Sequence, residues 1–371
     1  MKNKNSNIEN RYLGSIILYA VGDTLGYRNK DLKHKNNQMV ITEEITNELL
    51  HEFINLGGIN DIDLSDWIVS QHTIFCKCIL NVFIKKKYDF NEDLIKLLRE
   101  DLLKNIYEIL NDKNKDRNIS QILVDASKKF VKNEDCRTDN YNSDTGNNIP
   151  ALRSCCLGLI YNGKQNRQLL YDASIVTSKL TNTSVFGYLS GLTSALFTAF
   201  AIENIDVSKW PFLLVDVLNS KDVKKYVGNN DDEKNDYNMY INYWMKYIDN
   251  RFQDGVMIKT KAHTNLIFRA KFHFINFTEE TNYKLIGESG FGVVIMAYDS
   301  LLDAGRMWEK LVIYSTLHFG DCCGVGALSS SWYGAIYGYE NIPKNNYKHV
   351  ENFSELKDIG EKIYADRYRN V

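Results

Sequence analysis

Apolar residues recur at helical spacing over long stretches of this chain, whereas strict alternation of apolar and polar positions is rare. Residues 14–27 form one apolar stretch, and residues 308–317 form another that starts with polar side chains. The chain contains three prolines, and proline removes a backbone donor and interrupts the interior of a helix. The pattern therefore predicts a mostly helical protein, and no internal repeat stands out.

Two long stretches carry no charged residue, namely residues 180–202 and residues 322–339. The first is long enough to cross a membrane. It nevertheless contains Asn182 and several threonines and serines, and Gly187 and Gly191 lie one helical turn apart. Polar groups and small residues of this kind are typical of a buried helix that its neighbours approach closely. We therefore expect a core helix here and no membrane-spanning segment.

The composition is that of an ordinary globular protein and gives no electrostatic reason to expect a charged partner. The chain has 371 residues, 44% of them hydrophobic, and a formal net charge of −2. A chain of this length buries a full core, and its charge does not attract nucleic acid or anionic membranes. Residues 111–118 and 221–238 are rich in asparagine and lysine, and we expect both to form solvated loops.

The N-terminal residues and the spacing of the cysteines predict the domain organisation and the state of the thiols. Residues 1–11 are polar, and no apolar signal-peptide core follows them. We expect a flexible N-terminus followed by a single domain over residues 12–371, because no linker composition separates two halves. The seven cysteines show neither a disulfide framework nor a CxxC spacing. Reduced thiols are therefore expected, and with them a cytoplasmic location.

Two acids stand where apolar helices end. Asp321 directly precedes the uncharged residues 322–339, and Asp23 lies near the end of the apolar residues 14–27. An unpaired buried carboxylate is strongly disfavoured, so we expect Asp321 to coordinate a ligand. For Asp23, a structural explanation stands beside a functional one. An aspartate at a helix end accepts hydrogen bonds from backbone N–H groups that the helix leaves unpaired.

A polar motif, residues 69–73, reads Val-Ser-Gln-His-Thr and precedes a further apolar helix. Taken alone, Ser70 is an ordinary helix N-cap and His72 an ordinary surface histidine.

Residues 287–294 look like the glycine-rich loop of a protein kinase. Their G-x-x-G-x-G spacing differs from the G-x-G-x-x-G of kinases, and no Val-Ala-x-Lys strand follows.

Taken in order, these motifs resemble those of the ADP-ribosylglycohydrolase family, over residues 14–343. Residues 22–27 (GDTLGY) match the family's G-D-A-L-G-Y, and residues 69–73 fall where the family has V-S-D-D-T. Residues 318–324 (HFGDCCG) fall where it has H-G-G-D-S-D-[ST]. The motif sequences are most similar to those of the ADP-ribosylarginine hydrolases and their inactive paralogue. The resemblance implies an all-α fold, a single-domain orthogonal helical bundle that is a monomer.

In active members, the resemblance implies, two Mg²⁺ ions hold ADP-ribose and assist cleavage of its bond to arginine. The acid and hydroxyl ligands of these ions come from two places in the family's sequence. The first corresponds here to Gln71 and His72, which Ser70 and Thr73 flank, and the second to Asp321, Cys323 and Gly324 in the C-terminal loop. Of these five positions, Asp321 alone carries a carboxylate. Because Mg²⁺ requires near-octahedral oxygen coordination, the resemblance implies a degraded magnesium site.

The family's cleft also has ligand-contacting positions, which the resemblance places at Asp23, Asn147, Arg153, Asn182, Ser289 and Gly290. Several polar lip residues of the family are replaced here by apolar ones. Ile149 stands in place of a motif glycine, and Phe291 stands in place of a histidine. These replacements favour a closed cleft or an apolar ligand, whereas the retained polar residues favour a remaining site.

Three functions remain open. The chain is expected to be a pseudoenzyme with a reshaped cleft that binds ADP-ribose or an ADP-ribosylated protein. A residual or altered hydrolase that removes ADP-ribose from arginine is the second, and a structural partner protein with a filled cleft is the third.

A further prediction concerns zinc. If the two motifs meet, His72, Asp321 and Cys323 form a mixed ligand set that suits Zn²⁺ better than Mg²⁺. The alternative is that His72 and Cys323 merely fill vacated space.

Overall fold

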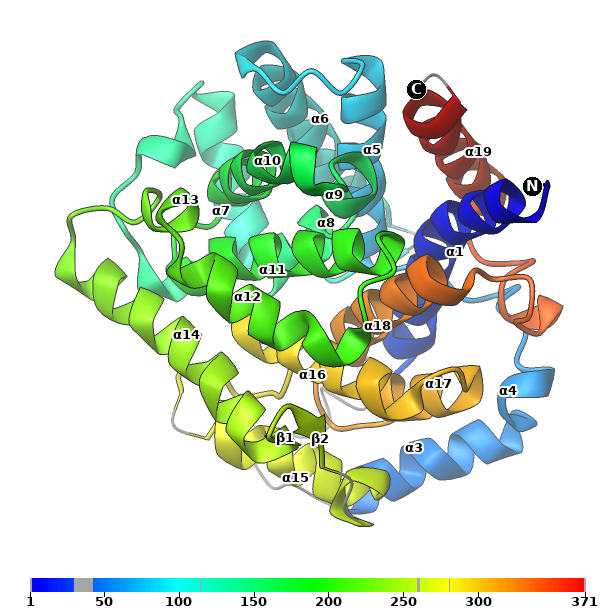
Figure 1. Cartoon of the computed structure of the whole chain (residues 1–371). Coiled ribbons are helices and arrows are strands. Elements are labelled where there is room, and N and C mark those ends of the chain that lie inside the picture. Colours follow the sequence, from blue (N-terminus) through cyan, green and yellow to red (C-terminus); the bar gives the residue numbers. More distant parts are fainter. Residues whose placement is uncertain (1, 30–42, 114, 259–260, 280, 370–371) are drawn as a thin grey trace.

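The computed structural model describes residues 2–29, 43–113, 115–258, 261–279 and 281–369. Its helices are α1 (Lys2–Tyr27), α3 (Glu43–Asn55), α4 (Gly58–Asp61), α5 (Gln71–Lys85), α6 (Glu92–Asn111), α7 (Gln121–Val131), α8 (Ile149–Ser154), α9 (Leu157–Ile160), α10 (Arg167–Lys179), α11 (Val185–Ile202), α12 (Trp210–Asn219), α13 (Lys221–Lys224), α14 (Asp231–Arg251), α15 (Leu266–Phe277), α16 (Gly290–Ala304), α17 (Trp308–Thr316), α18 (Cys322–Tyr337) and α19 (Phe353–Tyr364). Within these residues the strands are β1 (Phe252–Gln253) and β2 (Val256–Met257), an antiparallel pair. The predicted all-α fold is confirmed (Figure 1).

Helix α11 lies in the middle of the bundle (Figure 1) and packs against α8, α9, α10, α16 and α18. In the described part of the chain it is the one helix long and apolar enough to cross a membrane, and 94% of it is buried inside the protein. A Cβ atom at Gly191 would lie 2.1 Å from Ser178 Oγ. Small residues therefore let α10 approach α11, as expected of a core helix.

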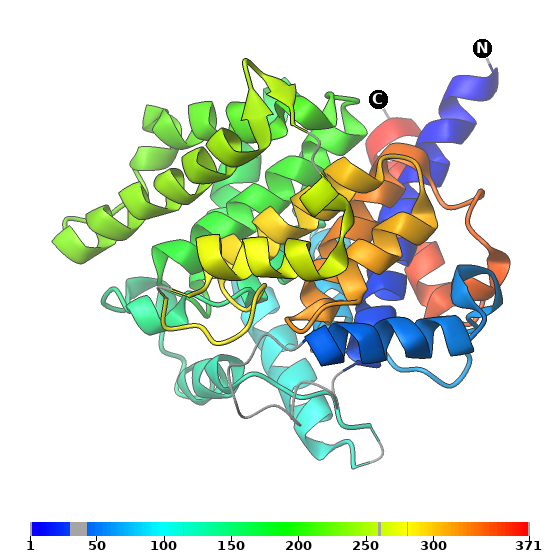
Figure 2. The same cartoon turned by 90° about the horizontal axis from the view of Figure 1, so that it is seen from below.

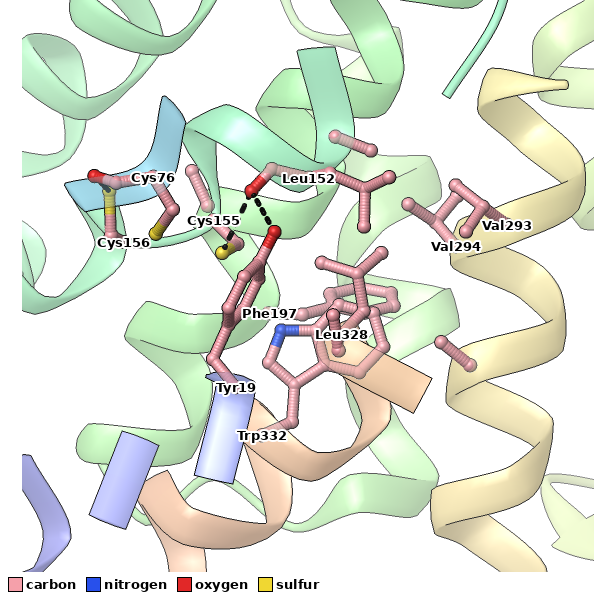
Figure 3. Packing of buried hydrophobic residues seen from close by; sticks show 14 of the residues in the cluster. Tyr19, Cys76, Leu152, Cys155, Cys156, Phe197, Val293, Val294, Leu328 and Trp332 are labelled. Atoms are coloured by element: carbon pink, nitrogen blue, oxygen red, sulfur yellow. Dashed lines mark hydrogen bonds between the residues drawn. The ribbon is translucent and has the colours of Figure 1, made fainter. Parts of the chain in front are cut away.

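Large aromatic side chains fill the space between α11 and its neighbours (Figure 3). The ring centroids of Phe197 on α11 and Trp332 on α18 lie 5.4 Å apart. The indole N–H of Trp332 donates to Thr198 Oγ1 at 3.1 Å, and the hydroxyl of Tyr19 donates to the Leu152 carbonyl at 2.8 Å. The polar atoms of these buried rings are therefore paired, which avoids the cost of burying an unsatisfied donor.

Glycines allow α1 and α18 to pack backbone against backbone. A Cβ atom at Gly22 would lie 2.1 Å from the Gly326 carbonyl oxygen, and one at Gly26 would lie 2.2 Å from that of Cys322. Because positions rise along α1 as they fall along α18, the two helices are antiparallel, and both views show them side by side (Figure 1 and Figure 2). The end of α1 is thereby brought against the start of α18.

The first residues of the chain differ from the expected flexible N-terminus. Helix α1 begins at Lys2, so the expected boundary after residue 11 falls inside a helix. Arg11 is buried and donates from Nε to the Ala335 carbonyl at 2.7 Å and from Nη2 to the Ile202 carbonyl at 3.1 Å. Arg11 thereby joins α1 to backbone oxygens near the ends of α11 and α18.

A buried cluster of charges joins α14, α15 and α16. Asp299 on α16 lies 3.1 Å from Nε of Arg251 and 2.6 Å from Nη2 of Arg269, and it accepts a hydrogen bond from the Tyr247 hydroxyl at 2.7 Å. Both arginines also contact Asp303. Burial alone would raise the pKa of the Asp299 carboxyl, but Arg269 and Arg251 outweigh it and hold that pKa well below its ordinary range. The cluster fixes three helices to one another.

Candidate functional site

Segments that are far apart in sequence meet around a small polar cavity. They are the end of α1, the start of α5, the residues before α7, the turn before α8 and the start of α18. The cavity has a volume of about 170 Å³ and is lined by Tyr27, Ser70, Gln71, His72, Arg117, Asn118, Ser120, Asn147, Asn148, Ile149, Asp321 and Cys323. The two motifs that contain His72 and Asp321 therefore face the same space, as the sequence predicted.

The start of α5 is held in place by hydrogen bonds to Asp23. Ser70 is the N-cap of the helix, and its hydroxyl accepts from the backbone N–H of His72 at 3.0 Å. The same hydroxyl donates to Asp23 Oδ1 at 2.6 Å, and the hydroxyl of Thr73 donates to Asp23 Oδ2 at 2.6 Å. The N-cap interpretation of Ser70 is confirmed. The surface interpretation of His72 is wrong, because that side chain is buried.

Asp23 itself is a structural brace between α1 and α5. Its side chain is fully buried and accepts hydrogen bonds from Ser70 and Thr73, and it is not among the residues that line the cavity. Burial raises the pKa of its carboxyl, and the nearby His72 and the hydrogen bonds from Ser70 and Thr73 oppose that rise. The sequence placed Asp23 in the ligand cleft, whereas the structure places it behind the helix start.

Asp321 is the N-cap of α18, and both oxygens of its carboxylate accept hydrogen bonds from the protein. Oδ1 accepts from the Gly324 backbone N–H at 3.2 Å and from the Cys323 thiol at 2.8 Å. Oδ2 accepts from Nδ2 of Asn148 at 2.6 Å, and the same amide donates to the Gly287 carbonyl at 2.8 Å. Asn148 thus ties the turn before α8 to the C-terminal motif, a contact that the sequence did not reveal.

Gly324 leaves room for Asn148. A Cβ atom at Gly324 would lie 3.2 Å from Nδ2 of Asn148, from Oδ2 of Asp321 and from Cδ1 of Leu152. These separations are tighter than most real Cβ contacts. A serine or threonine at this position would have to compete with the Asn148 amide for the space beside Asp321. A larger side chain at position 324 would therefore require these neighbours to shift by a few tenths of an ångström.

The ligand atoms of His72, Asp321 and Cys323 all lie within 4.8 Å of one another. Their side chains come from the first turns of α5 and α18, which the glycine contact between α1 and α18 helps to bring together. Gln71, the neighbour of His72, is committed elsewhere, since its Oε1 accepts from the Ser120 backbone N–H at 3.0 Å. The expected meeting of the two motifs is confirmed.

A partly buried ion-pair network forms another part of the cavity wall. Arg117 lines the cavity and donates from Nη2 to Glu351 Oε1 at 2.7 Å, and Lys115 donates to the same oxygen at 2.6 Å. Burial would raise the pKa of Glu351, but hydrogen bonds from Arg117 and Lys115 outweigh it and lower that pKa to about 2. Residues 111–118 were expected to form a solvated loop, and for Arg117, 7% exposed, that expectation is wrong.

Four of the remaining candidates support the turn before α8. Asn147 lines the cavity, and its Oδ1 accepts from Nδ2 of Asn182 at 2.9 Å. Asn182 is fully buried, Ser289 caps α16 by accepting from the Gly292 N–H at 3.0 Å, and Gly290 N–H donates to the Gly146 carbonyl at 2.9 Å. Among these four, Asn147 is the one that lines the cavity, and the others hold the surrounding backbone.

Arg153 lies away from the cavity, although the sequence suggested a ligand contact. Its side chain is buried, and Nη2 donates to the Thr177 carbonyl at 2.8 Å and to Thr181 Oγ1 at 3.0 Å. Burial lowers the pKa of the guanidinium to about 10. Arg153 therefore fastens α8 to the end of α10, where no carboxylate contacts it in the described structure.

The apolar replacements of the expected cleft lip are packed into the core. Phe291 stacks on Tyr243 with ring centroids 4.1 Å apart and meets Phe186 edge-on at 5.2 Å. Ile149 is also buried, although it lines one side of the cavity. Each of these contacts removes apolar surface from water, which stabilises a closed lip.

Comparison with known proteins gives consistent matches over almost the whole chain. The profile of the family described as ADP-ribosylglycohydrolase matches residues 4–370. The chain is 34% identical over 365 residues to the putative ADP-ribosyl glycohydrolase L444 of Acanthamoeba polyphaga mimivirus, covering 93% of this chain and 68% of the relative. It is 25% identical over 374 residues to the ADP-ribosylhydrolase ARH1 of Dictyostelium discoideum, covering 94% and 92%.

A solved structure described as an ADP-ribosylglycohydrolase-related protein complex has the same fold. It superimposes with a TM-score of 0.58 over 97% of this chain and 99% of the other, at 15% sequence identity. At that identity the likeness concerns the arrangement of helices alone. It agrees with the all-α architecture described above.

Proposed function

The chain belongs to the ADP-ribosylglycohydrolase family, and on that premise we propose that it is a pseudoenzyme whose magnesium-dependent hydrolase site is lost. One observation carries the proposal. Of the five positions where the family's metal ligands are expected, Asp321 alone has a carboxylate, and both of its oxygens accept hydrogen bonds within the protein. The other four positions offer an amide, an imidazole, a thiol and no side chain at all.

The residues present do not fit a pair of Mg²⁺ ions. Mg²⁺ is a small hard cation that demands near-ideal octahedral coordination by oxygen and gives up its water reluctantly. The amide oxygen of Gln71 is held by the Ser120 backbone, and Asn148 occupies the space beside Gly324. No hydrolytic step is therefore assigned through magnesium in this chain.

What remains is a small polar cavity that supports a binding role. Arg117, Asn147 and Asn148 present a guanidinium and amides around a volume of about 170 Å³. Typical small-molecule sites measure roughly 300–1,000 Å³, so this cavity accepts part of a ligand the size of a sugar ring. We assign it the ribose end of ADP-ribose, either free or attached to a modified protein.

A second candidate is an altered hydrolase that removes ADP-ribose from arginine by other means. The observation in its favour is that Asp321 still lines the cavity, beside the buried imidazole of His72. A carboxylate and an imidazole at hydrogen-bond range of a bound substrate are the usual groups for general acid–base catalysis. The two candidates differ in whether any bond is cleaved.

The test is an assay of ADP-ribose release from ADP-ribosylated arginine with excess Mg²⁺. We expect no release above a buffer control from the wild-type chain. The matched variant is Asp321→Asn, because asparagine caps a helix as well as aspartate and keeps the fold while removing the carboxylate. Release by the wild type that disappears in Asp321→Asn would refute the proposal and establish the altered hydrolase.

A further inference from the structure

We infer that the starts of α5 and α18 together form a site for one Zn²⁺ ion, with His72, Asp321 and Cys323 as its protein ligands. An imidazole nitrogen, a carboxylate oxygen and a sulfur lie within 4.8 Å of one another there. In the described residues, no other three histidine, cysteine or acidic side chains converge in this way. The inference rests on the proposed loss of the magnesium centre, because the same replacements create this donor set.

The donor set selects the metal. Thiolate and imidazole are softer ligands than the carboxylates and waters that Mg²⁺ prefers, and Zn²⁺ binds both readily. Three protein ligands with one exchangeable position describe the coordination of Zn²⁺ in open sites, whereas closed structural sites use four protein ligands. The cavity beside these residues supplies space for a water or a ligand atom at the fourth position.

Two of the three ligands are held by neighbours that lie outside the donor set. The backbone of His72 is held by the Ser70 cap, which is itself fixed to Asp23. The carboxylate of Asp321 is held by the Asn148 amide. Such second contacts are what position metal ligands and tune their affinity. Space filling alone does not call for this arrangement, since a small apolar residue at position 72 or 323 would serve equally well.

Metal binding requires a modest rearrangement and the loss of one proton. Zn²⁺ with bonds of about 2.0–2.3 Å holds its ligand atoms roughly 3.3–3.8 Å apart. The Cys323 thiol now donates a hydrogen bond to Asp321 Oδ1, with sulfur and oxygen 2.8 Å apart. On binding, the thiol proton passes to solvent and Zn²⁺ takes its place between sulfur and oxygen. No electron is transferred, so the step needs no oxidant or reductant.

The experiment uses the full chain, purified without an affinity tag and freed of metal with a chelator. We expect it to take up about one equivalent of Zn²⁺ after dialysis. Added Zn²⁺ should raise the thermal unfolding midpoint by a few degrees through mass action. Added Co²⁺ should give a charge-transfer absorption from thiolate to metal, because Cys323 is a ligand.

Two variants and one control decide the outcome. His72→Gln and Cys323→Ser should lose the retained zinc and its thermal shift. Cys322→Ser should keep both, because the Cys322 thiol donates to the His318 carbonyl at 2.8 Å and is absent from the converging group. The zinc-induced shift compares two states of one protein, so an altered stability of a variant does not obscure it.

Less than about a tenth of an equivalent of Zn²⁺ on the wild type would overturn the inference. Zinc retained equally by the His72→Gln/Cys323→Ser double variant would also overturn it. Both results are distinct from failure of the proposed function, which shows as magnesium-dependent release of ADP-ribose. A chain that hydrolyses substrate with Mg²⁺ and binds no zinc refutes both, and a silent chain without zinc refutes the metal site alone.

Discussion

Replacing Asp299 with alanine is expected to lower the free energy of unfolding by about 3–5 kcal/mol, the range for removing one partner of a buried ion pair. The substitution leaves Arg251 and Arg269 buried with Asp303 as their remaining carboxylate. It also removes the acceptor of the Tyr247 hydroxyl. Urea denaturation followed by circular dichroism measures the change.

The matched control is Asp216→Ala on α12, where the aspartate is exposed. Its removal is expected to change the free energy of unfolding by less than about 0.5 kcal/mol, as is usual for surface sites. Equal losses in the two variants would mean that the buried cluster contributes no more than a surface charge. The three-helix junction would then have to be stabilised by its apolar contacts.

Replacing Gly22 with alanine is expected to destabilise the protein by about 1–3 kcal/mol, the usual cost of overpacking. The added Cβ atom would lie 2.1 Å from the Gly326 carbonyl oxygen, which belongs to backbone and cannot rotate away. Separation of α1 from α18 would also displace Asp321 and Cys323 relative to His72. We therefore expect weaker zinc binding in the same variant, although the three atoms nearest to the added Cβ belong to Gly326 and Ser330 and not to a ligand.

Gly228→Ala is the control for this substitution. The nearest atom to its added Cβ is Glu233 Oε2 at 2.5 Å, the end of a side chain rather than a backbone atom, and no backbone atom of another segment lies within 4 Å. We expect a smaller loss of stability and unchanged zinc binding. An equal loss for both glycines, or a Gly22→Ala variant with normal zinc uptake, would contradict the view that the helix contact sets the geometry of the site.

The fold was predictable because its helices are long and apolar. Residues 180–202 carry no charge, and the observed helix α11 lies almost entirely buried within them. The close contact between α1 and α18 was not predicted, because the sequence does not show that the glycines of residues 14–27 and 322–339 face one another. The buried contacts of Arg11 could not be predicted, because polarity does not reveal that a side chain binds helix-terminal carbonyls.

The site was predictable where a motif defines it and obscure where tertiary contacts do. The meeting of His72 and Asp321 followed from a resemblance between motifs, since nothing local links two such distant positions. Asn148 could not be predicted, because its role depends on its contacts with the distant Asp321 and Gly324. Arg117 lies in a lysine- and asparagine-rich segment, which gave no sign of a buried residue. Its charge is paired with Glu351, which is distant in sequence.

The most direct test of the lost magnesium centre is a calorimetric titration of the metal-free chain with magnesium chloride. We predict heats no larger than those of dilution, both alone and in the presence of ADP-ribose. The reason is that one carboxylate, already hydrogen-bonded through both oxygens, cannot offset the dehydration of two Mg²⁺ ions. Saturable binding of two Mg²⁺ ions that is abolished by Asp321→Asn would contradict the account.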